Sequence, residues 1–289
     1  MSRPVTLRGA AMAEMAGITA RHPHAFRALP PERLRAIMLS LGATALLVFG
    51  FWRLGFEPIR LIDGFGQLIN FLGLMLPPDP GTWSRTLLIL RGLAETLAIA
   101  FLGTLCAAIL AFPLGFLAAR NTSINRVVHF FSRRLLDGVR GIDALIWALI
   151  WVSVVGLGPF AGVLAILTSD VGTFGKLFSE AIEAADRKPV EGIAASGGGK
   201  LAGIRFGVLP AVLPVMAGHL LYMFESNTRS STIIGIVGAG GIGLMLSEMI
   251  RTLEWNVVSF IVLLILVTVA VIDTISGRLR AALAGSRGR

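Results

Sequence analysis

Residues 144–169 read ALIWALIWVSVVGLGPFAGVLAILTS, an uncharged run of 26 residues whose division sets the number of membrane spans. A helix needs about 20 mainly apolar residues to cross the hydrocarbon core of a membrane, so this run is long enough for one tilted span. Its centre, however, is GLGP (residues 156–159), and closely spaced glycine and proline break a helix. Because apolar residues continue on both sides, we predict two spans, one ending near Val155 and the other running from Pro159 to about Phe178.

The same criterion finds four more spans, which makes six. They lie at about 36–52, 87–119, 204–224 and 255–275. Residues 53–86 contain four prolines and two aspartates, so we expect an extramembrane connection with one short helix. The predicted fold is therefore an all-α integral membrane protein with six transmembrane helices. The expected domains are a cytoplasmic tail at 1–35, a transmembrane domain at 36–280 and a short cytoplasmic tail at 281–289.

The composition agrees with a lipid environment and excludes most other classes. Hydrophobic residues make up 55% of the 289 residues, charged residues only 15%, and the mean hydropathy is +0.78. A soluble domain carries about 25% charged residues. The single cysteine, Cys106, and four scattered histidines provide neither a disulfide nor a metal-ligand pair, so no metal site is expected.

The net charge of +9 has a topological explanation. With six spans and both termini inside, 20 of the 26 Lys and Arg residues fall on the inner side and 6 on the outer side. Cytoplasmic segments of membrane proteins are enriched in these residues, and joining the two central spans would send residues 180–205 outside, against this rule. We therefore expect a multi-pass membrane protein with cytoplasmic N- and C-termini, and not a nucleic-acid-binding protein.

Residues 180–203, EAIEAADRKPVEGIAASGGGKLAG, are too polar to cross a membrane. They hold four carboxylates and three basic groups, and their apolar residues fit a short amphipathic helix. Pro189 suits the first turn of this helix, and the glycines at 197–199 suit its end. Such a helix is expected to lie across the cytoplasmic face and to present one side to a partner. The alternative is a solvated loop that only joins two spans.

Six positions in and after this segment resemble the E-A-A loop of ABC importer permeases, whose pattern is E-A-A, three residues, G, nine residues, I-x-L-P. They are Glu191, Gly192, Ile193, Gly197, Leu209 and Pro210. Three residues depart from the pattern, since Gly192 and Ile193 replace two alanines and Gly207 replaces the isoleucine. Glu183-Ala184-Ala185 is a more literal E-A-A, but in that register Pro189 stands where the glycine belongs.

The flanking sequence resembles the phosphonate-transport permeases. The similar stretches are residues 155–164, 172–181, 208–214, 229–235 and 237–243, and the resemblance covers about residues 85–280. It implies the type I ABC importer permease fold, with residues 180–203 as the cytoplasmic coupling loop. It also implies an importer subunit of the bacterial inner membrane that moves phosphonates or related phosphorus oxyanions inward. These substrates would be delivered by a periplasmic or other extracytoplasmic binding protein.

The same resemblance implies partners. Such permeases pair in the membrane, with a homodimer as the default, and two ABC ATPase subunits dock beneath them. Glu191, Gly192, Ile193 and Gly197 would then lie in the joint with the ATPase, followed by Leu209-Pro210. The chain is expected to be a transport subunit and no enzyme, with no cofactor of its own, because ATP and Mg belong to the ATPase.

Two glycine-rich motifs resemble nucleotide-binding motifs, but neither fits the full pattern. GAGGIG at 238–243 satisfies G-x-G-x-x-G, but no β-α-β pattern surrounds it and no acidic residue has the required spacing. GGGK at 197–200 is no phosphate loop, because Leu201 replaces the Ser or Thr. In the six-span prediction, 238–243 lies outside the membrane between the last two spans, where glycines allow close packing at a dimer seam or near an anion.

Charged residues within spans are costly and are functional candidates by default. Arg91 and Glu95 are four residues apart and are expected to neutralise each other. Asp143 and Asp170 are expected to anchor helices through hydrogen bonds.

A dense polar run begins at Glu225 and Arg229, and we hypothesise that it lines the path of an anionic substrate. The hypothetical path residues are Glu225, Ser226, Asn227, Arg229, Ser230, Ser231, Gly238, Gly240 and Gly241. The alternative is that Glu225 and Arg229 are a mutually neutralised pair at the outer end of a helix.

Three other functions compete with this interpretation. An ABC permease for another small solute, such as methionine or glycine betaine, would share the loop and the fold. An ion-coupled secondary transporter predicts an internal inverted repeat, which the sequence does not show. A membrane enzyme predicts a catalytic motif such as G-x-S-x-G or H-E-x-x-H, and the sequence contains neither.

Overall fold

The computed structural model describes residues 31–55 and 58–285, together with isolated positions between 12 and 19. Within these ranges every regular element is a helix. The chain forms two compact units, Met1–Asn70 and Phe71–Arg289. Most of the predicted N-terminal tail and the last four residues of the C-terminal tail lie outside the described residues.

The first unit contains α2 (Pro31–Arg53) and most of α3 (Pro58–Leu74). α2 is long and apolar enough to cross a membrane, and none of its apolar stretch is buried within the chain. It confirms the predicted first span, and α3 confirms the short helix expected in the connection that follows.

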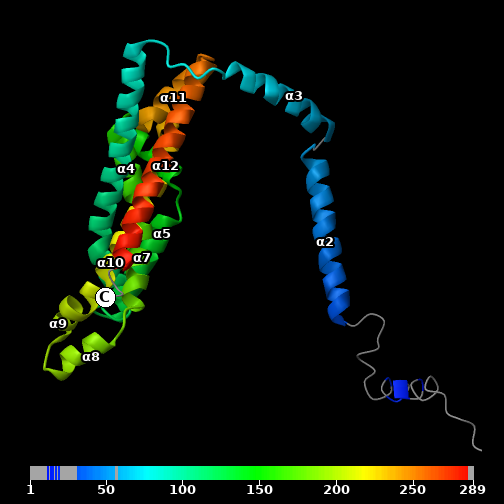
Figure 1. Ribbon diagram of the computed structural model, residues 1–289. Helices are drawn as coiled ribbons and strands as arrows, with labels where there is room; N and C mark the ends of the chain where they lie inside the picture. Colours follow the sequence, from blue (N-terminus) through cyan, green and yellow to red (C-terminus); the bar gives the residue numbers. More distant parts are fainter. Residues whose placement is uncertain are drawn as a thin grey trace, which may run out of the picture. The chain divides into compact units, whose positions relative to one another are not determined.

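The second unit holds the remaining helices (Figure 1). In chain order they are α4 (Trp83–Ala118), α5 (Arg126–Arg140), α6 (Ala144–Val155), α7 (Pro159–Glu183), α8 (Lys188–Ala195), α9 (Lys200–Ala202), the π-helical turn η1 (Gly203–Val208), α10 (Leu209–Ile234), a second π-helical turn η2 (Gly235–Ala239), α11 (Gly241–Arg251) and α12 (Trp255–Gly285). The long helices α4, α7, α10 and α12 form the bundle, with α8 and α9 at one end of it and α11 towards the other (Figure 1).

Among the described residues, five helices are long and apolar enough to cross a membrane, and a sixth span exists if the bent pair α5–α6 is counted as one. These two helices meet at 84°. α6 has 12 residues, and at about 1.5 Å per residue it is too short to cross a core of about 30 Å alone. The break predicted at GLGP is confirmed, because Gly156 and Gly158 have φ values of 91° and 136° between α6 and α7.

Small residues bring α4 and α7 into close contact at the centre of the bundle. A Cβ atom on Gly103 would lie 2.7 Å from Ile166, and one on Gly115 would lie 2.8 Å from Cβ of Phe178. Helices in membranes associate mainly through such close packing, because lipid tails are as apolar as the side chains. Phe174 is fully buried in the same interface.

The span predicted to end near Phe224 continues further. The helical segment from Lys200 runs through α10 and η2 to Ala239. The polar residues from Glu225 onward therefore lie inside a long helix and do not follow it. The outer loop expected before the last span is replaced by the end of α10, by η2 and by α11.

Candidate functional site

α8 is the short polar helix expected between two spans, and its end is fixed by a glycine. Gly197 has φ of +85°, in the left-handed region that glycine adopts without a steric penalty. The N–H of Gly197 donates to the carbonyl of Ala194 (3.0 Å) and that of Gly198 to the carbonyl of Ile193 (2.9 Å). These two bonds form a Schellman motif, so the predicted helix end is confirmed.

One side of α8 is held against η1. A Cβ atom on Gly207 would lie 2.9 Å from Cγ2 of Val190, and one on Gly203 would lie 3.2 Å from its Cγ1. Gly207 is the position at which the E-A-A pattern has an isoleucine. The departure therefore has a physical reason, because the backbone of η1 approaches Val190 too closely for a large side chain.

The other side of α8 is free. Glu191 and Gly192 are exposed, and no atom lies within 4 Å of the Cβ position of Gly192. Ile193 is half-buried, because it lies about one turn from Val190 and lines the cavity between α8 and η1. Leu209, half-buried, and Pro210, exposed, form the first turn of α10 beside this region. The structure thus presents the predicted loop residues on one end of the bundle.

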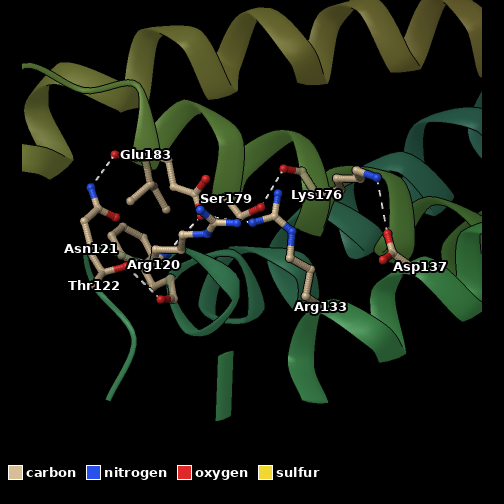
Figure 2. A network of polar contacts seen from close by, with 10 residues as sticks. Arg120, Asn121, Thr122, Arg133, Asp137, Lys176, Ser179 and Glu183 are labelled. Carbon is tan, nitrogen blue, oxygen red and sulfur yellow. Dashed lines mark hydrogen bonds and ion pairs between the residues drawn. The ribbon is translucent and has the colours of Figure 1, made fainter. Parts of the chain in front are cut away.

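Glu183 ties the helices behind α8 together (Figure 2). At the C-terminal end of α7, its Oε1 accepts hydrogen bonds from the backbone N–H of Arg120 (2.9 Å) and from the guanidinium of Arg133 (3.0 Å). Beside it, Nδ2 of Asn121 donates to the carbonyl of Ile182 (2.7 Å). Glu183 therefore holds the helix ends next to α8 together as a frame, and the choice of Glu191 as the first residue of the loop motif stays a prediction.

Two further contacts complete this frame. Nζ of Lys176 on α7 donates to Asp137 on α5 at 3.2 Å (Figure 2). Nζ of Lys200, just after α8, donates to the carbonyl of Ser123 at 3.0 Å. The loop between α4 and α5 is consequently attached both to the end of α7 and to the segment that follows α8.

A second polar group lies within the bundle, on α10. Nδ2 of Asn227 donates to Oγ1 of Thr104 on α4 (2.8 Å) and to the carboxylate of Asp170 on α7. All three side chains are buried. Asp143 caps α6 by accepting from the N–H of Leu145 (2.8 Å). The predicted anchoring roles of Asp170 and Asp143 are both confirmed.

Glu225 is buried and binds two arginines. It accepts from Arg229 on its own helix at 3.4 Å and from Arg280 on α12 at 3.0 Å. The pair of Glu225 and Arg229 exists, but its expected place at the outer helix end is wrong, because α10 continues to Ile234 and η2 follows it. Arg280 was missed, since its sequence position indicates only a basic tail.

The polar run of α10 divides into two faces. Asn227 and Ser231 are buried, and the hydroxyl of Ser231 donates to the carbonyl of Asn227 at 2.6 Å. Ser226 and Ser230 are half-buried, and the side chain of Arg229 is 49% exposed. Of these residues, those of the second face have the more exposed polar groups, and their role in a substrate path stays a prediction.

The glycines of GAGGIG are buried in close packing. Glu95 on α4 accepts from the N–H of Gly241 (2.7 Å), and Oγ1 of the neighbouring Thr96 accepts from Ile242 (2.8 Å), so both residues cap α11. The N–H of Gly158 donates to the carbonyl of Gly238 at 3.0 Å.

Two expectations change with this packing. The pairing expected between Glu95 and Arg91 is wrong, because Glu95 binds a backbone amide. Gly238, Gly240 and Gly241 do not form the expected outer loop, because they are buried where helical segments pack against one another. Their role in a substrate path stays a prediction.

The helical bundle, with the short polar helix α8 attached at one end, is that of a multi-pass membrane protein. Residues 111–287 match the family described as the inner membrane component of binding-protein-dependent transport systems. The match covers more than half of the chain, and the chain belongs to this family.

The names of individual proteins similar to this chain agree with this family. PtxC of Stutzerimonas stutzeri, a phosphite transport system permease protein, is 36% identical over 88% of this chain and 96% of its own length. PhnE of Mycolicibacterium smegmatis, a phosphate-import permease protein, is 35% identical over 87% of this chain and 47% of its own length. A solved inward-facing structure of the MetNI methionine ABC transporter has a TM-score of 0.61 at 21% identity, covering 70% of this chain and 99% of the solved chain. The fold is therefore that of a type I ABC importer permease.

Proposed function

We propose that this chain is the membrane-spanning permease subunit of an ATP-driven importer for phosphonates, phosphite or related phosphorus oxyanions. The observation that carries the proposal is the similarity to PtxC over nearly the whole length of both chains. PhnE is likewise named for the import of a phosphorus oxyanion. The likeness to MetNI is too distant in sequence to favour methionine as the substrate.

α8 is proposed as the coupling helix that docks into an ATPase. Its free face, with Glu191 and Gly192, is available for a partner, and Ile193 contributes from the half-buried edge of the helix beside η1. Gly197 fixes the end of α8. On its other side, Val190 packs on η1, and the Glu183 frame joins α7 to the loop before α5. A displacement of α8 by ATPase closure would thus move the ends of α7 and α10 as one body.

The substrate path is proposed along the more exposed face of α10. Ser226 and Ser230 provide hydroxyl groups there, and Arg229 provides a guanidinium that binds oxyanions through paired hydrogen bonds. Glu225 holds this guanidinium from one side, while Arg280 neutralises the same carboxylate from the other. Asn227 and Ser231 then act as buried supports, and Gly238, Gly240 and Gly241 shape the end of the face through their packing.

The assembly proposed around the chain follows from its family. It consists of two copies of this permease, two ABC ATPase subunits that carry ATP and Mg, and an extracytoplasmic phosphonate-binding protein. No cofactor is proposed for the permease itself. The excess of Lys and Arg on the α8 side favours cytoplasmic N- and C-termini.

Uptake by whole cells tests the function. A strain without its own uptake systems for phosphite and phosphonates is given this permease with its ATPase and binding protein, and the entry of labelled phosphite and methylphosphonate is measured. We expect uptake that stops without the ATPase and that methionine does not inhibit. Uptake that persists without the ATPase would contradict the importer class.

Two variants test the path. Arg229→Ala should reduce uptake strongly at normal assembly, whereas Arg251→Ala, an exposed arginine at the end of α11, serves as the control and should not. Glu225→Gln should reduce uptake less, because the amide oxygen still accepts from one arginine. Normal uptake by Arg229→Ala would refute the proposed path.

A further inference from the structure

The start of α5 forms a basic pocket that the proposed function does not use. Its cavity, about 510 Å³ in volume, is lined by Arg120, Ser123, Asn125, Arg126, His129 and Phe130. The lining contains two guanidiniums and an imidazole but no carboxylate.

A neighbouring cavity does not share this excess of positive charge. The space under α8, about 240 Å³, has Asp186 and Glu191 in its lining together with Arg187 and Lys200, so its charges balance. Of these two cavities, the α5 pocket is the one whose lining has uncompensated positive charge. A third cavity, between α10 and α12, is lined by His219 and Arg280, but Arg280 is paired with Glu225. An anion is the ligand that the α5 pocket attracts.

The basic groups of this pocket are available for a ligand. Among the described residues, no carboxylate lies within ion-pair distance of the guanidinium of Arg120 or Arg126, whereas the next arginines along α5 bind Glu183 and Asp137. Nδ1 of His129 is buried and has no hydrogen-bond partner in the described part of the chain. Buried polar groups normally have a partner, so His129 retains an unused hydrogen-bonding atom beside the two arginines.

The surroundings of the pocket are apolar and open. Five side chains on and just before α5 are each more than half exposed, namely Ile124, Val127, Phe130, Phe131 and Leu135. A helix with arginines beside an exposed apolar face is typical of the interface between lipid headgroups and acyl chains. A free anion would bind the arginines but leave this apolar face uncovered, whereas a phospholipid covers both.

We propose that the α5 pocket binds the phosphate group of an anionic phospholipid of the inner leaflet, with its acyl chains along the apolar face of α5. The proposal rests on the cytoplasmic placement of the α8 end given above. Ser123 lines the pocket, and its carbonyl holds Lys200 just after α8, while the N–H of Arg120 is bound to Glu183. A lipid bound here therefore touches the loop that braces the coupling helix.

Lipid retention by the full-length permease tests this site. The protein is purified into nanodiscs of phosphatidylglycerol or phosphatidylcholine, and the lipids that stay bound after transfer to detergent are counted by native mass spectrometry. We expect phosphatidylglycerol to be retained preferentially. Each of Arg120→Gln and Arg126→Gln should weaken this retention about fivefold, the effect of one basic group near an anionic surface.

The controls distinguish the loss of a charge within the pocket from the loss of any surface charge and from misfolding. Arg251→Gln, which removes an exposed arginine at the other end of the bundle, should retain phosphatidylglycerol as the wild type does. Arg126→Lys keeps the charge and should retain it nearly as well. Equal retention of both lipids, or full retention by the double Gln variant, would overturn the proposal.

A separate experiment distinguishes a bound phospholipid from a soluble anion. Inorganic phosphate at millimolar concentration should not displace the bound phosphatidylglycerol. If phosphate displaces it completely, the pocket is a site for a free anion and the lipid proposal fails. Phosphite uptake is measured on the same variants, so that a failure of the lipid site with normal uptake leaves the transport proposal intact.

Discussion

The two glycine-rich segments of this chain, residues 197–199 and 238–243, look alike in sequence but differ in their surroundings. Around Gly197 and Gly199 no atom lies within 4 Å of the Cβ position, and only Gly198 is tight, with its Cβ position 2.5 Å from Cγ2 of Ile193. In the second segment, a Cβ atom on Gly241 would lie 2.3 Å from Oγ1 of Thr96, and one on Gly243 would lie 2.0 Å from the carbonyl oxygen of Thr232. In the first segment the main requirement for glycine is the positive φ of Gly197 at an exposed helix end. In the second segment the lack of space is added to positive φ at Gly238, Gly240 and Gly241.

The difference between the surroundings of the two segments reflects how the two ends of the bundle are built. The end with α8 exposes a short helix on a braced frame, as a docking element requires. The packing around η2 and α11 joins α4, α7 and α10 without space for side chains, so it holds the helices together. Substitutions at the two ends should therefore differ in kind, and four of them, in or beside the two segments, test the comparison.

The largest effect is expected from Gly243→Ala. The new methyl group would overlap with the carbonyl of Thr232, so α10 and α11 must move apart. Overpacking of this kind costs about 3 kcal/mol. The thermal stability of the purified permease should fall sharply and phosphite uptake should be lost with it. A variant as stable as the wild type would show that the close contact is wrong.

Glu95→Ala should have the next largest effect. It leaves the N–H of Gly241 without its acceptor at the start of α11, which costs about 1–2 kcal/mol. Glu95→Gln, which keeps an acceptor oxygen, is the matched control and should lose less stability. Equal losses for both variants would indicate that the charge matters and the hydrogen bond does not.

Gly197→Ala should act locally. The φ of +85° is unfavourable for alanine by about 1 kcal/mol, so the end of α8 should change while the bundle stays folded. We expect nearly unchanged thermal stability of the permease but weaker retention of the ATPase during co-purification. A global loss of stability as large as that of Gly243→Ala would remove the distinction between the two segments.

Gly192→Ala should have the smallest effect. The position is exposed inside α8 and open around its Cβ, and alanine favours a helix over glycine by about 0.5–1 kcal/mol. It also restores a residue of the E-A-A pattern. Uptake and ATPase retention should remain at or slightly above the wild-type level, and a clear loss of either would mean that the partner needs the bare backbone of Gly192.

The parts of the fold that the sequence predicts well are those set by local chemistry. The break at GLGP follows from two glycines and a proline, and the end of α8 follows from Gly197. Hydropathy locates the long helices because the bilayer imposes a minimum apolar length.

The parts that could not be predicted depend on contacts between distant residues. Glu95 and the amide of Gly241 are 146 positions apart, and Glu225 and Arg280 are 55 apart, so no local pattern links them. Hydropathy also placed the end of the fifth span too early. Asn227 and its neighbours lower the average, although they face the bundle and find partners there.

The central claim is that α8 joins this permease to an ATPase. Its most direct measurement is co-purification of the ATPase with Glu191→Arg, compared with Glu248→Arg, an equally exposed carboxylate on α11 at the other end of the bundle. The account predicts that Glu191→Arg loses the ATPase and phosphite uptake while keeping its thermal stability, and that Glu248→Arg keeps all three. Full retention of the ATPase by Glu191→Arg would contradict it.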